Sequence, residues 1–175
     1  MPKDATGAQP LGVVVRHAAD WFSDSLYMAT FYEDIAFVGS GLLWHQFGLF
    51  NQGQSGQVLR VYGNTTFSEG GGGFQASFSS GSIGVQVGDA TGIRPDQPVP
   101  RASIWATHQQ TALGTVNPFL STRPFGLLAA PGFDSGTTFS PFPMFIVPAG
   151  YSLVVTNPQS SSVAGVGWWF QLANL

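Results

Sequence analysis

Apolar and polar residues alternate with a period of two along much of the chain. The alternation is clearest over 74–79, where every second residue is Phe or Ala, and over 83–88, where every second residue is Ile or Val. It also runs through 57–62 and through YSLVVT at 151–156. Because successive side chains of a strand point to opposite faces, each segment predicts a strand with one buried face.

The segment VAGVGWWFQL at 163–172 is the most informative of these strands. Its even-numbered positions are all apolar, so Trp168 is predicted to lie in the core. Trp169 must then face outward, beside Gly167, which has no side chain to cover it. An outward-facing tryptophan needs a neighbour, which can be a loop, a second subunit or a ligand.

Further strands are predicted in four segments: 11–16, 27–37, 42–50 and roughly 102–107. Gly-, Pro- and Asn-rich turns separate them, and helix signals are poor. Many short strands without helices predict an all-β fold, an antiparallel jelly roll or β-sandwich of about eight strands. We expect an N-terminal arm at 1–10 and a single jelly-roll domain at 11–175.

Two stretches lack the strand alternation. Residues 89–101 are Pro-rich and polar, and are predicted to form an exposed loop. Residues 111–143 are too long for an ordinary loop of a compact domain, so their aromatics are expected to pack on the same sandwich or on another chain. With Trp169 as the first choice, the predicted interface residues are Phe119, Phe125, Phe133, Phe139 and Phe142.

Composition strengthens the expectation of an assembly. Only 9% of the 175 residues are charged, against about 25% in an ordinary globular domain. Fifteen Phe and five Trp argue against disorder. Residues 35–59 and 135–175 carry no Asp, Glu, Lys or Arg. Because charge keeps free monomers apart, so uncharged a surface favours a subunit of a larger structure.

The same composition excludes several classes of protein. The net charge is −3 with six scattered basic residues, so a nucleic-acid partner is not expected. The sequence has no signal-peptide stretch and no run of 18 apolar residues, so neither secretion nor a membrane partner is expected. The absence of cysteine removes disulfides and thiolate sites, and agrees with folding in a reducing cytoplasm.

Candidate chemistry is sparse. His17, Asp20 and Ser23 lie close in sequence, but their spacing builds no catalytic relay and no G-x-S-x-G elbow is present. His45 and His108 lack metal-ligand spacing with His17, although three subunits could place one histidine each around a symmetry axis. His45 is predicted to be a satisfied core or interface histidine. We therefore expect no enzyme activity, catalytic residue, cofactor or metal.

Three segments carry a family resemblance: QFGLFNQGQSGQVLRVYG (46–63), FIVPAGYSLVVTNPQSSS (145–162) and the terminal GVGWWFQL. They resemble small structural proteins encoded near the head genes of tailed bacteriophages, which are similar to jelly-roll capsid cement (decoration) proteins. The resemblance implies a homotrimer on the capsid exterior of a virion, made in the host cytoplasm, with the major capsid protein as its partner.

The region before Phe50 carries little of this resemblance. Its acidic residues are either a docking site for basic capsid residues or a solvated face; they are Asp20, Asp24, Glu33 and Asp34. Adjacent residues of a strand face opposite sides, so Glu33 and Asp34 cannot flank one glycosidic bond as catalytic carboxylates. Two alternatives stay open: another virion component, such as a head-fibre base, tail or host-binding module, and a carbohydrate-binding jelly-roll lectin with an aromatic stacking platform.

Overall fold

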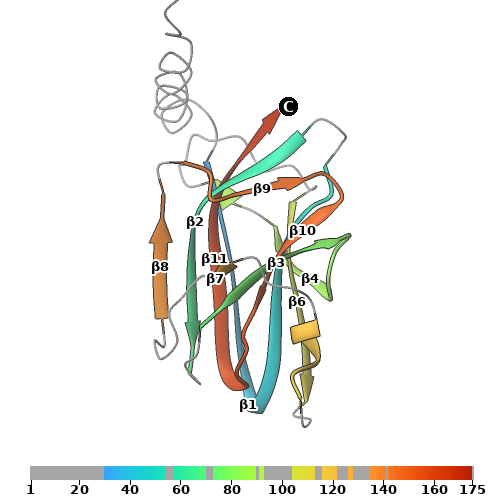
Figure 1. Ribbon diagram of the computed structural model, residues 1–175, viewed down its shortest axis with the longest axis vertical. Coiled ribbons are helices and arrows are strands. Elements are labelled where there is room, and N and C mark those ends of the chain that lie inside the picture. Colours follow the sequence, from blue (N-terminus) through green and yellow to red (C-terminus); the bar gives the residue numbers. More distant parts are fainter. Residues whose placement is uncertain are drawn as a thin grey trace, which may run out of the picture.

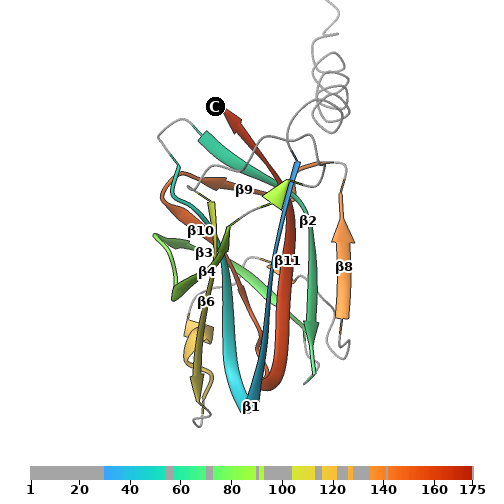
Figure 2. The same ribbon diagram turned by 180° about the vertical axis from the view of Figure 1, so that it is seen from behind.

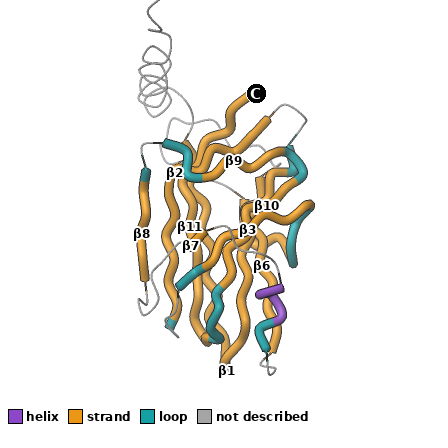
Figure 3. The backbone as a smooth tube through the Cα atoms, in the orientation of Figure 1, coloured by secondary structure: helices purple, strands orange, loops and turns teal. Residues whose placement is uncertain are grey.

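A computed structural model describes residues 30–53, 57–69, 73–89, 91–92, 104–112, 116–121, 126–127, 135–140 and 142–174. They form eleven strands and one short 3-10 helix, η1 (Figures 1 and 3). The longer strands are β1 (Thr30–Asn51), β2 (Gln57–Ser68), β3 (Gln75–Ser80), β4 (Val85–Asp89), β6 (Ile104–Ala112), β8 (Ser135–Phe139), β9 (Phe145–Pro148), β10 (Tyr151–Thr156) and β11 (Ser161–Asn174). The two-residue strands β5 (Thr91–Gly92) and β7 (Gly126–Leu127) and the helix η1 (Pro118–Ser121) complete the set.

All of the strand pairs are antiparallel, and they make one strongly curled sheet. The curl is centred on β1, which bends back on itself at one end of the molecule (Figures 1 and 2). The first half of β1 pairs with β11, whereas its second half lies between β6 and β10. β1 therefore runs through two parts of the curled sheet, which we call its walls. In one wall β1 pairs with β11, and in the other it lies between β6 and β10.

The bend of β1 falls at Gly39–Ser40–Gly41. Pairing with β11 shifts register between Val38 and Leu43, and Gly41 has a φ of +117°, which favours glycine. The chain between β10 and β11 turns at the same place, since Leu43 pairs with Ser161. Two neighbouring segments thus pass together from one wall to the other.

The core lies inside this curl. β1, β2, β3, β6, β9, β10 and β11 all contribute to one cluster of buried apolar side chains. Trp168 is the largest of them and is fully buried, with Phe47 of β1 and Phe74, just before β3, in the same cluster. Burying an aromatic side chain of this size is worth several kcal/mol, so the cluster holds the two walls together.

A buried asparagine stabilises the corner of the sheet, by which we mean the bend of β1 together with the neighbouring turn between β10 and β11. Asn157, between β10 and β11, is fully buried, and its Nδ2 donates to Ser68 Oγ at 2.8 Å and to Ser161 Oγ at 3.2 Å. Its Oδ1 accepts from the Gln159 amide at 3.0 Å, which makes an Asx turn. Its own backbone amide donates to the His45 carbonyl at 3.1 Å. One side chain therefore joins β2, the β10–β11 turn and β11, and its backbone joins β1.

Segments 46–63 and 145–162 meet at the other end of the molecule. Asn51 is fully buried; its Nδ2 donates to the Val147 carbonyl at 3.0 Å and its Oδ1 accepts from the Gly53 amide. The Gly150 amide donates to the Asn51 carbonyl at 2.7 Å, and Gly150 has a φ of +80°. The GLFN and PAGY sequences are thus the two sides of one tight junction.

Most of the strand predictions are confirmed. The alternation at 151–156 coincides with β10, and 163–172 lies within β11. Residues 30–37 and 42–50 of two predicted strands instead belong to one strand, β1, because pairing with β11 continues across the bend between them. Residues 27–29 of the first predicted strand lie outside the described residues. The predicted strand 11–16 and arm 1–10 lie outside the described residues. The strand order of the described residues, β7-β3-β10-β1-β11-β2-β8, does not show a jelly-roll topology.

The prediction that 111–143 holds no strand is wrong. β6 extends to Ala112, and β8 pairs with β2 over Ser135–Phe139. β8 shows no apolar alternation because it forms an end of the sheet, where neither face needs to be buried. Within the predicted loop 89–101, the two-residue β5 pairs with β1.

The corner network yields a stability prediction. Asn157→Ala should lower the free energy of unfolding by about 2–4 kcal/mol, because it leaves buried hydroxyl and amide groups without their partners. Gln159→Ala is the matched control, since its exposed side chain lies in the same turn, and we expect a change within about 0.5 kcal/mol. Urea unfolding measures both, and equal effects would contradict this role for Asn157.

Candidate functional site

A row of residues crosses the outer face of β11, β2 and β8. Trp169 pairs with Gly63, and Gly63 pairs with Phe139. The rings of Trp169 and Phe139 meet above the glycine edge-to-face, with centroids 6.3 Å apart and an interplanar angle of 82°. A Cβ at Gly63 would lie 2.7 Å from the Phe139 ring and 2.9 Å from the Thr138 carbonyl oxygen, so the ring contact requires glycine there.

The two tryptophans have the predicted orientations. Trp168 is fully buried, whereas Trp169 is half-buried on the opposite face. The neighbour that Trp169 needs is supplied in part by Phe139 of its own chain. Its predicted role in an interface stays a prediction.

Other aromatic side chains extend this face. Phe139 is 58% exposed and Phe67, on the same face of β2, is 36% exposed. Phe142, in the turn that follows β8, is 50% exposed. We call the three residues that strand pairing places on this face the outer aromatic surface: Phe67, Phe139 and Trp169. Exposed aromatic groups gathered in this way are typical of an interaction surface.

β8 gives this surface an open edge. It ends the path of the sheet and pairs with β2 alone among the described strands (Figure 2). Proteins usually protect such edges with charged side chains, proline or bulges. The sequence of β8, SGTTF, contains no charge and no proline. Its edge is therefore suited to contact with another chain.

The remaining predicted site residues are dispersed. Phe119 lies in η1, close to the second half of β1 rather than to β8. Glu33 and Asp34 lie in β1, where Glu33 pairs with Trp168 and Asp34 with Gly167. Four others lie outside the described residues: Asp20, Asp24, Phe125 and Phe133.

Inside the curl, two histidines form a directed hydrogen-bonded chain. His45 is fully buried, and its Nε2 lies 2.9 Å from the Ser161 carbonyl oxygen. A carbonyl oxygen only accepts, so Nε2 carries the proton of the neutral ring. His45 Nδ1 must then accept from Nε2 of His108, 3.1 Å away. His45 is a satisfied core histidine, as predicted.

Burial favours the neutral form of both rings. It lowers the pKa of His45, and the hydrogen bond to the Ser161 carbonyl acts in the opposite direction. Burial and the nearby His45 ring lower the pKa of His108 to about 4. The rings also stack on each other and on Phe47, with the His108 and Phe47 centroids 4.9 Å apart. The pair is thus a neutral structural link between β6, β1 and the corner.

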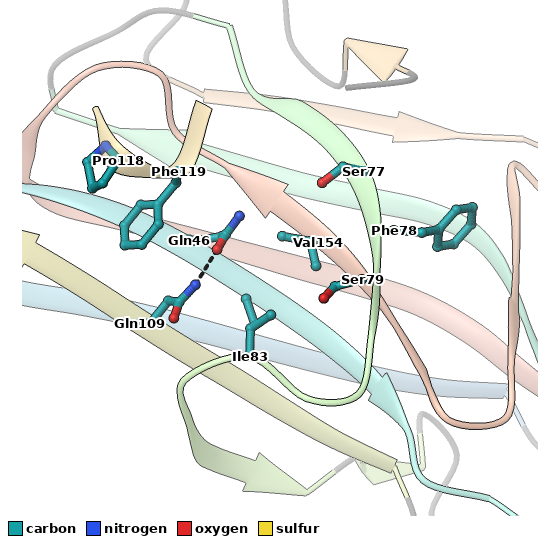
Figure 4. Close-up of a pocket in the computed structure, with 9 residues that line it drawn as sticks. All are labelled: Gln46, Ser77, Phe78, Ser79, Ile83, Gln109, Pro118, Phe119 and Val154. Carbon is teal, nitrogen blue, oxygen red and sulfur yellow. Dashed lines mark hydrogen bonds between the residues drawn. The ribbon is translucent and has the colours of Figure 1, made fainter. Parts of the chain in front are cut away.

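A groove lies on the opposite face of this part of β1, and sequence analysis did not anticipate it. It has a volume of about 260 Å³. Residues from β1, β3, β6, β10, the β3–β4 turn and η1 line it: Gln46, Ser77, Phe78, Ser79, Ile83, Gln109, Pro118, Phe119 and Val154 (Figure 4). These residues are brought together only by strand pairing, so no local motif signals the groove.

Among the described residues, no group of three or more His, Cys, Asp or Glu side chains could hold a metal ion. No helix in this part of the chain is long and apolar enough to cross a membrane.

Comparison with protein-family models, curated proteins and solved structures finds no match to this chain.

The histidine pair predicts a loss of stability in acid. The folded-state pKa of His108 lies below the usual 6.5, so the unfolded chain binds protons first as the pH falls. The melting temperature should therefore drop between pH 6.5 and about 4, and this contribution should level off at lower pH.

His108→Gln tests this, because its amide can still donate to His45 but does not titrate. Thermal unfolding followed by circular dichroism should show a flatter pH dependence for the variant over this window. An unchanged slope would mean that other groups cause the acid sensitivity.

Proposed function

We propose that this protein is a structural component of a virus particle, a capsid cement (decoration) protein of a tailed-bacteriophage head. The observation that carries the proposal is the uncharged outer aromatic surface beside the open edge of β8. Such a surface has little use on a free monomer, and obligate interfaces are more apolar than transient ones. The resemblance of the GLFN, PAGY and GVGWWFQL segments to phage head proteins supports the same function.

A homotrimer fits this surface and this composition. Three copies related by a closed rotation would each present β8 and Trp169 to a neighbour, without leaving an edge open. Because the resemblance is to jelly-roll cement proteins, we take the curled antiparallel sheet to be a variant of the jelly roll. As a trimer, the protein would contact several capsid subunits at once, so modest single contacts would give tight attachment.

A cement protein stabilises a capsid because it binds the assembled shell in preference to the free capsid subunit. A trimer that binds the major capsid protein in the closed shell, and not the free subunit, stabilises the shell by mass action. The protein would be made in the host cytoplasm and would act on the capsid exterior. The acidic residues Asp20, Asp24, Glu33 and Asp34 are the candidate contacts with basic capsid residues.

Self-assembly is tested by placing a charge in the outer aromatic surface. In solution we expect a mass of roughly 55 kDa, three times 18.5 kDa, for the unchanged protein. Phe139→Lys should shift the mass toward the monomer, because burying an unpaired ammonium group in an interface is costly. Trp169→Ala should weaken assembly by a tenfold or larger factor in Kd while the fold survives. Light scattering on a sizing column measures both.

Val116→Lys is the matched control, since Val116 is 74% exposed and lies outside this surface. It should leave the mass unchanged. A Phe139→Lys variant that assembles as well as the control would remove the surface from the proposal. Loss of the monomer fold in Trp169→Ala would mean that Trp169 stabilises the single chain rather than the assembly.

Capsid docking is tested by neutralising the four acids together, Asp to Asn and Glu to Gln. We expect weaker decoration of empty heads, with a smaller dependence of binding on salt, because screened charge pairs would be lost. Co-sedimentation with capsids at two salt concentrations measures this. Undiminished occupancy would mean that these acids form a solvated face.

A further inference from the structure

The groove over β1 and β3 combines neutral polar groups with apolar walls. Its polar groups are the amides of Gln46 and Gln109 and the hydroxyls of Ser77 and Ser79. Phe119 and Ile83 supply apolar walls, as Figure 4 shows, and the described residues that line the groove include no Asp, Glu, Lys or Arg. Phe78 points away from the centre of the groove, toward the other face of β3 (Figure 4).

The amide groups of the groove are held in place. Gln46 is buried, and its Nε2 donates to Thr156 Oγ1 at 3.0 Å. Its Oε1 accepts from Gln109 Nε2, so the Gln109 carboxamide is oriented by its neighbour. Gln109 is only half-buried and keeps its Oε1 and its second amide hydrogen for other partners. A preorganised donor and acceptor lose little entropy when a ligand binds.

We propose that this groove binds a neutral sugar unit of a glycan. A pyranose ring has an apolar face of C–H groups, which suits the Phe119 ring, and hydroxyls around its rim, which suit Gln109, Ser77 and Ser79. A charged ligand would lose hydration without finding an opposite charge among the lining residues. Pockets for drug-sized ligands hold about 300–1,000 Å³, so a groove of about 260 Å³ takes one ring.

The sugar site goes beyond the proposed function and does not depend on it. The outer aromatic surface involves β2, β8 and β11, whereas the groove is built on β1, β3, β6, β10 and η1. A capsid protein with this groove would also attach the particle to surface glycans. Assembly and sugar binding are measured separately, so failure of one leaves the other standing.

Saturation-transfer NMR on the full chain tests the proposal. The probes are methyl glucoside, methyl galactoside, methyl mannoside and N-acetylglucosamine at millimolar concentration, with glucuronic acid and glucosamine as charged counterparts. At least one neutral sugar should receive saturation, and its charged counterpart should receive less. No transfer to any neutral probe would overturn the proposal.

Variants then locate the site. Phe119→Ala and Gln109→Ala should each weaken binding of the sugar by about tenfold. Phe119→Leu keeps apolar volume but removes the ring, so it should show the same loss even if Phe119→Ala does not fold. Phe142→Ala is the matched control, an exposed phenylalanine outside the groove, and should bind normally. Binding unchanged in both Phe119→Leu and Gln109→Ala would overturn the assignment.

Discussion

The fold depends on keeping strand pairing intact around one corner. β1 and the β10–β11 segment change walls together, so backbone groups at the turn would be buried without partners if nothing met them there. Asn157 and His45 supply those partners, with bonds that reach Ser68, Ser161 and the backbone of both segments. Once the corner is closed, the core, the outer aromatic surface and the groove all have fixed positions.

Strand positions were readable from the sequence, but the buried face was not always: Val85 and Val87, on the face predicted to be buried at 83–88, are 66% and 49% exposed. Alternation predicted β10, most of β11, and the opposite orientations of Trp168 and Trp169. It split β1 at Gly39–Ser40–Gly41, because a glycine-rich bend inside a continuous pairing has the same local composition as a turn between two strands. β8 was missed because an end strand has no face that must be apolar.

The candidate sites were less accessible to prediction because they depend on register. The contact of Trp169 with Phe139 needs Gly63 between them, and this follows from pairings that span more than one strand. Gln46 and Gln109 meet only because β6 pairs with β1 in one register. The sequence did indicate that His45 would be satisfied, but its partner His108 is 63 residues away.

The open edge of β8 has a consequence for the chain before assembly. The small residues of the first four positions of β8, SGTT, specify register weakly, so two free copies can pair in more than one alignment. Unproductive pairing depends on the square of the free-chain concentration, whereas capture by an existing partner site depends on its first power. If the chain assembles as proposed above, the ratio of its synthesis rate to its capture rate therefore sets the yield of correctly assembled protein.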